Sequence, residues 1–465
     1  MELMGQFLLS SLPWIAGTFV AMGSAFLIRT EHGSFTTTIL IAGVGGPIGY
    51  LIFAAILNLG VGVTFFDYGN LRFLKIISAI TLVGLICLLL VDLKSTIGRE
   101  LNSDVRFPLI LLAVLLIGLV IAVSYCILWL PAIGYDVLDH WAPKARLLIA
   151  QLSADGAGEL LNNHRHPNTL KLVLAWTAWT AEATGADTFL LLPWALMTFS
   201  LQLVLFSFAV LVSSSVSLGL FVALGAITTP LMENHIFLAG YAEVPIALFL
   251  SSSCAFIAVG MLKDRLEYQV FGVILAMAIL FLKGSGVFFA LLPVISLLLT
   301  YSREGSHNHR ILLVCLIVGS LSILAFSVVF EVNGNLWGFD GHRFRAFGWR
   351  TGLTDVSVLE ISRNLVYAYF INSSFSVLPL AFAVLFVLMP RHYGRSEFFL
   401  MVAISLGLIF LATTQLTSYG LRHARVGFDT GNSRFSMPVL MMVWLLVPFM
   451  AKVVRKPYGT VPRAA

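Results

Sequence analysis

A pair of carboxylates stands directly after an apolar segment of the chain. Asp136 and Asp139 lie within Gly134–Arg146, which follows the apolar run that ends at Leu130. A carboxylate at the exit of a membrane helix can act as a general base toward an acceptor hydroxyl or amine. Asp is also a good residue for capping the N-terminus of a helix. The spacing alone therefore leaves two roles open for Asp136, catalysis and capping.

Lysine and arginine residues near the ends of apolar segments form a second group of candidates. A phosphate leaving group develops negative charge, which a cation at the level of the lipid headgroups stabilises. The cations in suitable positions are Lys144, Arg165, Lys283, Arg343, Arg345, Arg350, Arg422, Arg425 and Arg434. The alternative role for these residues is contact with lipid headgroups or anchoring at the interface.

Lys283 is the sharpest of these candidates. The sequence Lys283-Gly284-Ser285-Gly286 interrupts two short apolar runs, and unwound backbone at membrane depth usually lines a site. A tight turn whose lysine reaches the headgroups is the simpler alternative. We therefore expect Lys283 to bind a phosphate group, with further contacts from Arg343, Arg345, Arg434 and Lys144.

Three further residues could take part in substrate binding. Asp139 shares a helical face with Asp136 if a helix has begun there, so it could orient a substrate or bind a cation, or remain in solvent. Glu243 is either a second acidic site residue or an ordinary first-turn acid of an apolar helix. His166 lies in the same long polar segment as the two aspartates. No His pair at helical spacing stands beside a carboxylate, so we predict no metal site. No cofactor is certain, although a divalent cation is compatible with the acidic residues.

The composition identifies the environment of these residues. Of the 465 residues, 59% are hydrophobic and 11% are charged, against about 25% charged in ordinary soluble domains. A soluble protein is therefore excluded. The four cysteines lie in apolar blocks without metal or disulfide spacing. The net charge of +5 reflects membrane topology, and no nucleic-acid partner is expected.

The apolar runs predict an all-α polytopic membrane protein with a single transmembrane domain over 1–465. At about 20 apolar residues per crossing, the chain holds about thirteen transmembrane helices. We expect them near 7–28, 38–62, 74–92, 108–130, 187–212, 216–231, 243–262, 268–282, 285–301, 311–331, 364–389, 397–417 and 436–452. The glycines of 43–49 predict a close approach between helices.

Lysine and arginine predict which loops face the cytoplasm. Short basic loops form one alternating set, which holds Arg29, Lys94, Arg99, Arg106, Lys263, Arg265, Arg303, Arg310, Arg391, Arg395, Lys452, Arg455, Lys456 and Arg463. The other set faces outward and contains the long polar segments 131–186, 332–363 and 418–435. In the first of these we expect juxtamembrane helices near 137–151 and 170–183. The catalytic candidates concentrate on this outer face.

One motif in the first outer loop resembles a known family. Asp136, Trp141 and Lys144-Ala145 have the spacing D-x4-W-x2-K-A. This resembles the W-D-x-W-x-x-W-x-x-K-A signature of a bacterial branch of the C-type membrane glycosyltransferases, which are related to protein O-mannosyltransferases and aminoarabinose transferases. Tyr135 and Leu138 stand where that pattern has its first two tryptophans.

Later segments resemble the same family in the same order. Ala239-Gly240-Tyr241-Ala242-Glu243-Val244-Pro245 is similar to G-Y-A-D-x-P, with Glu243 in place of Asp. His166-Pro167-Asn168 resembles the start of an H-P-D-Y-P loop, and Lys283-Gly284-Ser285-Gly286 resembles T-K-x-E-G without its Glu. Arg434-Phe435-Ser436-Met437-Pro438 resembles a late R-x-x-x-P element. The resemblance extends from about 115 to 440.

The resemblance implies an inverting glycosyltransferase in the bacterial inner membrane, with an active site that faces the periplasm. Asp136 would be its general base. The implied partners are a polyprenyl-phosphate sugar donor, an acceptor that is a glycolipid, a polysaccharide or a protein, and the membrane lipids.

A secondary transporter or lipid flippase is the competing class. The breaks at Lys283–Gly286 and at Thr228-Thr229-Pro230 resemble the interrupted helices of transporters. Transporters also carry ionisable residues near the midplane and internal repeats. Here nearly all Asp and Glu fall at helix ends or in loops, and no internal duplication is visible. A membrane enzyme of another type, such as a lipid phosphotransferase, is a weaker third class.

Overall fold

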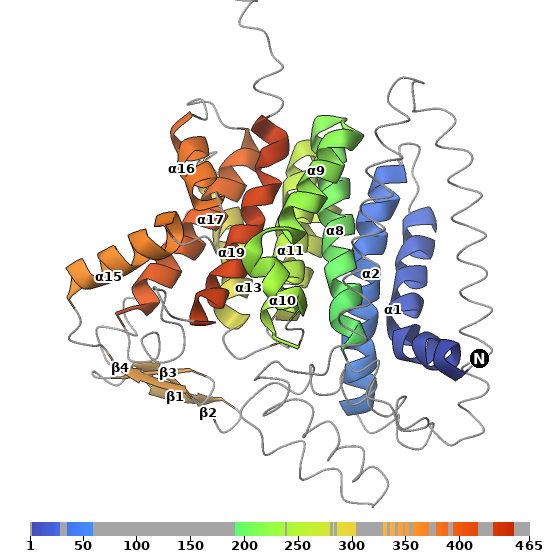
Figure 1. The fold of residues 1–465 in the computed structure, drawn as a ribbon, viewed down its shortest axis with the longest axis horizontal. Coiled ribbons are helices and arrows are strands. Elements are labelled where there is room, and N and C mark those ends of the chain that lie inside the picture. Colours follow the sequence, from blue (N-terminus) through green and yellow to red (C-terminus); the bar gives the residue numbers. More distant parts are fainter. Residues whose placement is uncertain are drawn as a thin grey trace, which may run out of the picture. The chain divides into compact units, whose positions relative to one another are not determined.

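The computed structural model describes a defined part of the chain. It comprises residues 2–27, 35–58, 191–237, 240–279, 282, 286–303, 329–332, 335–339, 343–346, 349–352, 357–371, 378–388, 394–416 and 431–450. This part is mostly helical, as the sequence predicts (Figure 1). The chain divides into two compact units, one containing 1–228, 232–252 and 281–283 and the other 229–231, 253–280 and 284–465.

Helices α1 (Glu2–Leu27), α2 (Phe35–Asn58) and α8 (Leu192–Ser213) pack together in the first unit (Figure 1). Gly17, Gly45 and Gly49 form the contact between α1 and α2. A Cβ atom at Gly49 would overlap the carbonyl oxygen of Pro13 and would lie 2.9 Å from the Cα of Gly17. The close approach predicted from the glycines of 43–49 is therefore confirmed.

Buried polar contacts hold these three helices in register. The hydroxyl of Tyr50 on α2 donates to the carbonyl oxygen of Ser10 on α1 at 2.9 Å. The indole nitrogen of Trp14 on α1 donates to the hydroxyl of Ser200 on α8 at 3.0 Å. Each bond gives a polar atom a partner in largely apolar surroundings, where an unbonded polar atom would be costly.

The predicted span 216–231 contains one helix, α9 (Val216–Ile227), and the first two residues of another, α10 (Pro230–Phe237). Ser214 precedes α9 in a left-handed conformation with φ 55°, and the Ser215 hydroxyl caps α9 by accepting from Leu218 N at 3.3 Å. Pro230 opens α10, which explains the break because proline has no N–H to continue the preceding helix.

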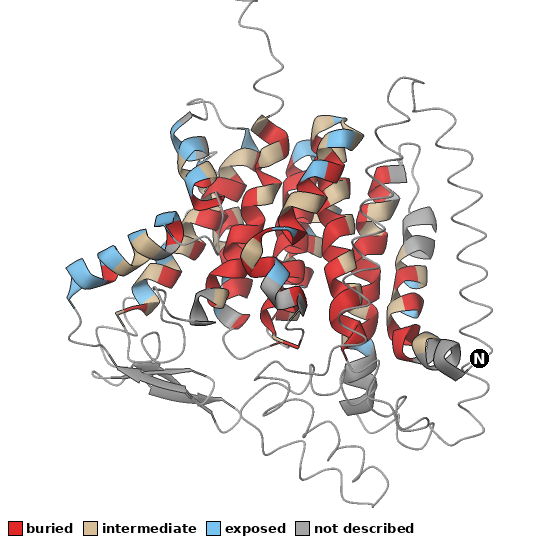
Figure 2. Cartoon of the chain, in the orientation of Figure 1, coloured by how far each residue is buried: buried red, intermediate tan, exposed pale blue. Residues whose placement is uncertain are grey.

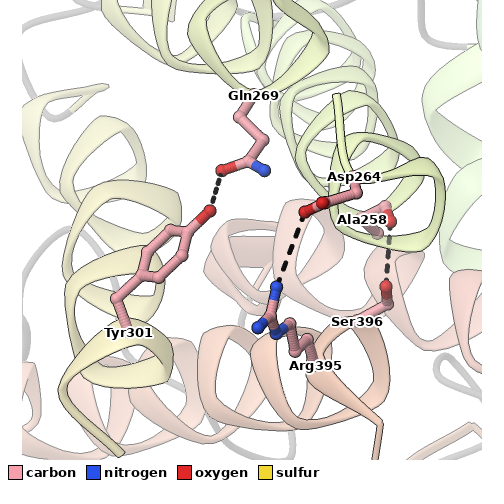
Figure 3. A network of polar contacts seen from close by, with 6 residues as sticks. All are labelled: Ala258, Asp264, Gln269, Tyr301, Arg395 and Ser396. Atoms are coloured by element: carbon pink, nitrogen blue, oxygen red, sulfur yellow. Dashed lines mark hydrogen bonds and ion pairs between the residues drawn. The ribbon is translucent and has the colours of Figure 1, made fainter. Parts of the chain in front are cut away.

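Helices α11 (Glu243–Lys263), α12 (Leu266–Ala278), α13 (Gly286–Arg303) and α17 (Arg395–Thr414) correspond to predicted apolar spans. The residues at one end of this group are polar (Figure 3). The Arg395 guanidinium lies 3.6 Å from the Asp264 carboxylate, and Ser396 Oγ donates to the carbonyl oxygen of Ala258 at 2.9 Å. The Tyr301 hydroxyl donates to Gln269 Oε1 at 2.6 Å.

These contacts bring three of the predicted basic loops to the same end of the second unit. Arg395 begins α17, and Asp264 forms the turn between α11 and α12. The third loop follows Arg303 at the end of α13. The guanidinium of Arg303 lies 4.5 Å from the centre of the Phe398 ring on α17. This agrees with placing the three loops on one side of the membrane.

A small antiparallel sheet lies where the sequence analysis expected an outer loop. Its strands are β1 (Val329–Val332), β2 (Asn335–Phe339), β3 (Arg343–Ala346) and β4 (Trp349–Gly352), in the order β1-β2-β3-β4 (Figure 1). The all-α expectation is therefore incomplete, and 332–363 is not simply a loop. Residues 329–331 at the end of the predicted span 311–331 belong to strand β1.

Within the predicted span 364–389 the structure describes two segments, and residues 372–377 between them lie outside the described residues. An α-helix, α15 (Val358–Val366), continues as a π-helical turn, η4 (Tyr367–Ile371). Helix α16 (Leu378–Leu388) comprises the 11 described residues that follow.

The C-terminal apolar segment is made of short helical pieces: η6 (Gly431–Ser436) and η7 (Met442–Leu445) are 3-10 helices that flank α19 (Met437–Met441). Three of the described helices, α8, α11 and α17, are long and apolar enough to cross a membrane. Thirteen transmembrane helices stay a prediction, and the spans 74–92 and 108–130 lie outside the described residues. Buried positions concentrate in α8 and α11, whereas α15 is largely exposed (Figure 2).

We expect Gly49→Ala to destabilise the protein, because the added methyl group meets backbone atoms of α1 that cannot rotate away. Overpacking of this kind costs about 1–3 kcal/mol, which should appear as a lower thermal midpoint in detergent. Gly43→Ala is the matched control, since its methyl group would lie 3.1 Å from the Leu203 side chain. An equal loss in both variants would contradict the close contact at Gly49.

Candidate functional site

Only some of the predicted site residues fall in the described part of the chain. Asp136, Asp139, Lys144 and His166 lie outside it, and so do both predicted juxtamembrane helices. Lys283 also lies outside, between Leu282 and the start of α13. Glu243 and Arg434 are described with their side chains, whereas Arg343 and Arg345 are described by their positions in a strand.

Glu243 is buried at the first residue of α11, with 1% of its surface exposed. The loop before it is tied to the start of α8, because the Trp194 indole nitrogen donates to the carbonyl oxygen of Tyr241 at 2.8 Å. Gly240 in that loop has φ 107°, a conformation that glycine adopts without strain. A carboxylate in the first turn interacts favourably with the helix dipole. The location therefore fits a structural role and leaves the acidic site role as a proposal.

The register of the sheet brings three arginines together. Arg345 on β3 pairs directly with Arg350 on β4, and Arg343 is two residues away on β3. Successive residues in a strand occupy opposite faces of a sheet, so all three arginines occupy positions on one face. Like charges at directly opposite positions are destabilising. A bound anion would relieve this repulsion, which makes the face a candidate phosphate site.

Arg434 lies in a different part of the second unit. Its guanidinium is 5.7 Å from the centre of the neighbouring Phe435 ring, within the range of a cation–π contact. Two residues later, the hydroxyls of Ser436 and Tyr369 form a buried hydrogen bond of 2.8 Å. This bond ties η6, which carries Arg434, to η4, which follows the sheet and α15 in the chain.

The predicted site residues are thus assembled only in part. The sheet joins Arg343, Arg345 and Arg350, which are all candidate cations of the sequence analysis, while Arg434 lies on η6, which is tied to η4. Glu243 belongs to the first unit. Among the described residues there is no group of three or more His, Cys, Asp or Glu that could hold a metal ion.

Buried polar residues near the middle of two helices were missed by the sequence analysis. Gln202 in α8 is 1% exposed, and neither atom of its amide group has a hydrogen-bond partner among the described residues. The hydroxyls of Ser251, Ser252 and Ser253 in α11 are also buried and have no hydrogen-bond partner among the described residues. Polar residues inside membrane segments are often functional. The sequence signal that could have identified them is the presence of neutral polar residues within otherwise apolar runs.

Comparison of the chain with protein-family models, with curated proteins and with solved structures gave no match.

We expect Tyr369 and Ser436 to be energetically coupled in a double-mutant cycle. Tyr369→Phe and Ser436→Ala each remove one hydroxyl, and the remaining hydroxyl is then buried without its partner. Each variant should lower the free energy of unfolding by about 1–3 kcal/mol, and the double variant should cost less than the sum. Denaturant unfolding in detergent measures the three changes. Strict additivity would show that the bond contributes nothing.

Proposed function

We propose that the protein is a membrane glycosyltransferase that moves a sugar from a polyprenyl-phosphate donor to an acceptor. The reaction takes place on the outer, periplasmic face of the bacterial inner membrane. Asp136 is the general base, and the arginines of the sheet hold the donor phosphate, together with Lys283, Arg434 and Lys144. The acceptor is a glycolipid, a polysaccharide or a protein.

The proposed reaction is a single displacement at the anomeric carbon. An acceptor hydroxyl or amine attacks this carbon from the face opposite the phosphate, and its proton passes to the Asp136 carboxylate. The bond between the anomeric carbon and the phosphate oxygen breaks, and its electron pair leaves with the polyprenyl phosphate. Cations near that oxygen stabilise its growing negative charge, and the anomeric configuration is inverted.

The observation that carries the proposal is the cluster of Arg343, Arg345 and Arg350 on one face of the sheet. Three adjacent cations are unfavourable in an empty sheet and favourable around a phosphate, which arginine binds with two parallel hydrogen bonds. The resemblance of Asp136, Trp141 and Lys144-Ala145 to the glycosyltransferase signature adds support.

One observation favours the alternative of a secondary transporter or lipid flippase. Gln202 and Ser251–Ser253 are buried polar residues near the middle of α8 and α11, the depth at which transporters bind their substrates. Reconstitution into liposomes distinguishes the two functions. Accumulation of a substrate without a covalent change would favour transport, whereas a new sugar on an acceptor would favour transfer.

Asp136→Asn should abolish most of the transfer activity, because the amide cannot accept the acceptor proton. Loss of a general base lowers turnover by about 10²–10⁴-fold. The assay follows sugar transfer from a polyprenyl-phosphate donor by purified protein, and size-exclusion chromatography checks that the variant is folded. Asp155→Asn, in the same predicted outer loop, is the matched control and should keep normal activity. Normal turnover in folded Asp136→Asn would overturn the assignment.

Arg345→Thr should change stability and donor binding in opposite directions. Removing one of two directly opposed arginines should raise the stability of the free protein by about 0.2–1 kcal/mol, while the KM for the donor rises. Thermal unfolding and donor titrations measure the two effects. The control is Arg265→Ala, whose guanidinium lies 3.3 Å from Glu267 in an exposed pair; it should leave the KM unchanged. A variant that loses stability and keeps its KM would assign Arg345 a purely structural role.

A further inference from the structure

Helix α15 exposes several large apolar residues, as α12, α13, α16 and α17 of the second unit also do. Leu359 is 80% exposed and Val358 is 70% exposed, and Val366 at the end of the helix is 53% exposed. In the η4 turn that continues α15, Phe370 and Ile371 are exposed to a similar degree. Figure 2 shows this exposure along α15.

The exposed apolar residues form a stripe. Leu359 and Val366 are seven residues apart, so they lie on the same side of an α-helix, and Phe370 follows four residues later. Glu360 and Asn364, which are four residues apart, occupy the polar side. Ile361, which is buried, covers the side that packs against protein. The stripe is therefore a second apolar surface, distinct from the one that attaches α15 to its unit.

The ends of this helical segment are held in place. The Ser357 hydroxyl caps α15 by accepting from Leu359 N at 3.2 Å, and Tyr369 in η4 is hydrogen-bonded to Ser436. The exposed stripe therefore lies between a capped N-terminus and a tethered C-terminus. The apolar residues of the stripe lie on a helix that is already formed. Binding of this stripe to a surface therefore does not carry the entropic cost of folding the segment.

The sheet that precedes α15 has one face with basic positions and one face with aromatic positions. Its register places the arginines on one face. By the same alternation, the positions of the other face hold aromatic residues, namely Phe330, Trp337, Phe339, Phe344 and Trp349. Aromatic residues, and Trp in particular, concentrate where hydrocarbon meets the headgroups of a bilayer.

The charge of the described residues in this segment suits an anionic surface. The four strands and α15 contain four arginines, Arg343, Arg345, Arg350 and Arg363, against two glutamates, Glu331 and Glu360. Basic residues beside an apolar helical face strengthen binding to anionic lipids. The three helices α8, α11 and α17 are long and apolar enough to cross a membrane, so a bilayer is the surface that α15 would meet.

We propose that α15 and η4 lie in the lipid–water interface of an anionic bilayer, with Leu359, Val366 and Phe370 directed toward the acyl chains. Helices of this kind sit about 5–10 Å deep at the boundary between headgroups and acyl chains. This inference does not depend on the proposed sugar transfer.

The test compares two neighbouring positions that are both exposed and differ only in their side of the helix. Leu359→Cys and Glu360→Cys are prepared in a background in which Cys87, Cys126, Cys254 and Cys315 are replaced by Ala. Each single cysteine is labelled with a nitroxide in full-length protein, in nanodiscs of phosphatidylglycerol and phosphatidylcholine. Power saturation then measures collisions with oxygen, which concentrates in lipid, and with a water-soluble nickel chelate.

We expect the ratio of oxygen to nickel accessibility to be severalfold higher at 359 than at 360. Equal nickel accessibility at both positions would place the stripe in water and overturn the proposal. Low accessibility to both reagents at 359 would show that another part of this chain, or a second copy, covers the stripe, which also overturns it.

A second pair of variants guards against a local effect of the label. A nitroxide at Val366→Cys should show the same lipid exposure, and adding Leu359→Asp should lower its oxygen-to-nickel ratio, because a carboxylate in the acyl region lifts the helix. An unchanged ratio at 366 in the presence of Leu359→Asp would contradict insertion of the stripe.

Discussion

The cost of leaving a backbone polar group unbonded in apolar surroundings shapes this protein more than any single contact. Where no water is available, each N–H and C=O must find its partner within the same segment. Long apolar runs therefore become helices such as α8, α11 and α17, and breaks occur where a residue can end a helix. Ser214 and Asp264 provide such breaks in left-handed conformations, and Pro230 opens a new helix. Charged residues, which are costlier still, collect at the helix ends, as with Asp264 and Arg395 at one end of the second unit.

The elements predicted correctly are those whose signal is the total length of an apolar run. Helices α1, α2, α8, α11, α13 and α17 begin and end within a few residues of the predicted spans. The sheet was missed because its strands have four or five residues, and alternation over so short a distance was hidden in a polar segment. Helix α15 was missed for a related reason. Its apolar residues are arranged by side, and a search for continuous hydrophobicity merges such a helix with the apolar run that follows.

For the site, residue types could be chosen from the sequence but their relations could not. Arg343, Arg345 and Arg350 were selected as cations in an outer segment. That Arg350 stands opposite Arg345 depends on strand register, which is fixed by pairing between strands. Glu243 was expected at the start of a helix, and it is there, yet its burial is seen only in the folded structure. Gln202 is a neutral residue in an apolar run, so a search for charge passes over it, and only packing reveals that its amide is enclosed.

The two sets of polar residues support different functions, and their energies help to weigh them. Between their terminal turns, α8, α11 and α17 contain no Asp, Glu, Lys or Arg. A buried amide or hydroxyl without a partner costs about 1–3 kcal/mol, a cost that a stable helix bundle can tolerate without any function. Neutral dipoles of this kind can bind an uncharged solute, and several of them together can replace the hydration shell of an ion. Directly opposed arginines are destabilising in a sheet, and an anion bound between them would offset that cost. The register that places Arg345 opposite Arg350 is therefore the observation that supports the proposed chemistry on a phosphate, and the buried amide and hydroxyls support the alternative of transport.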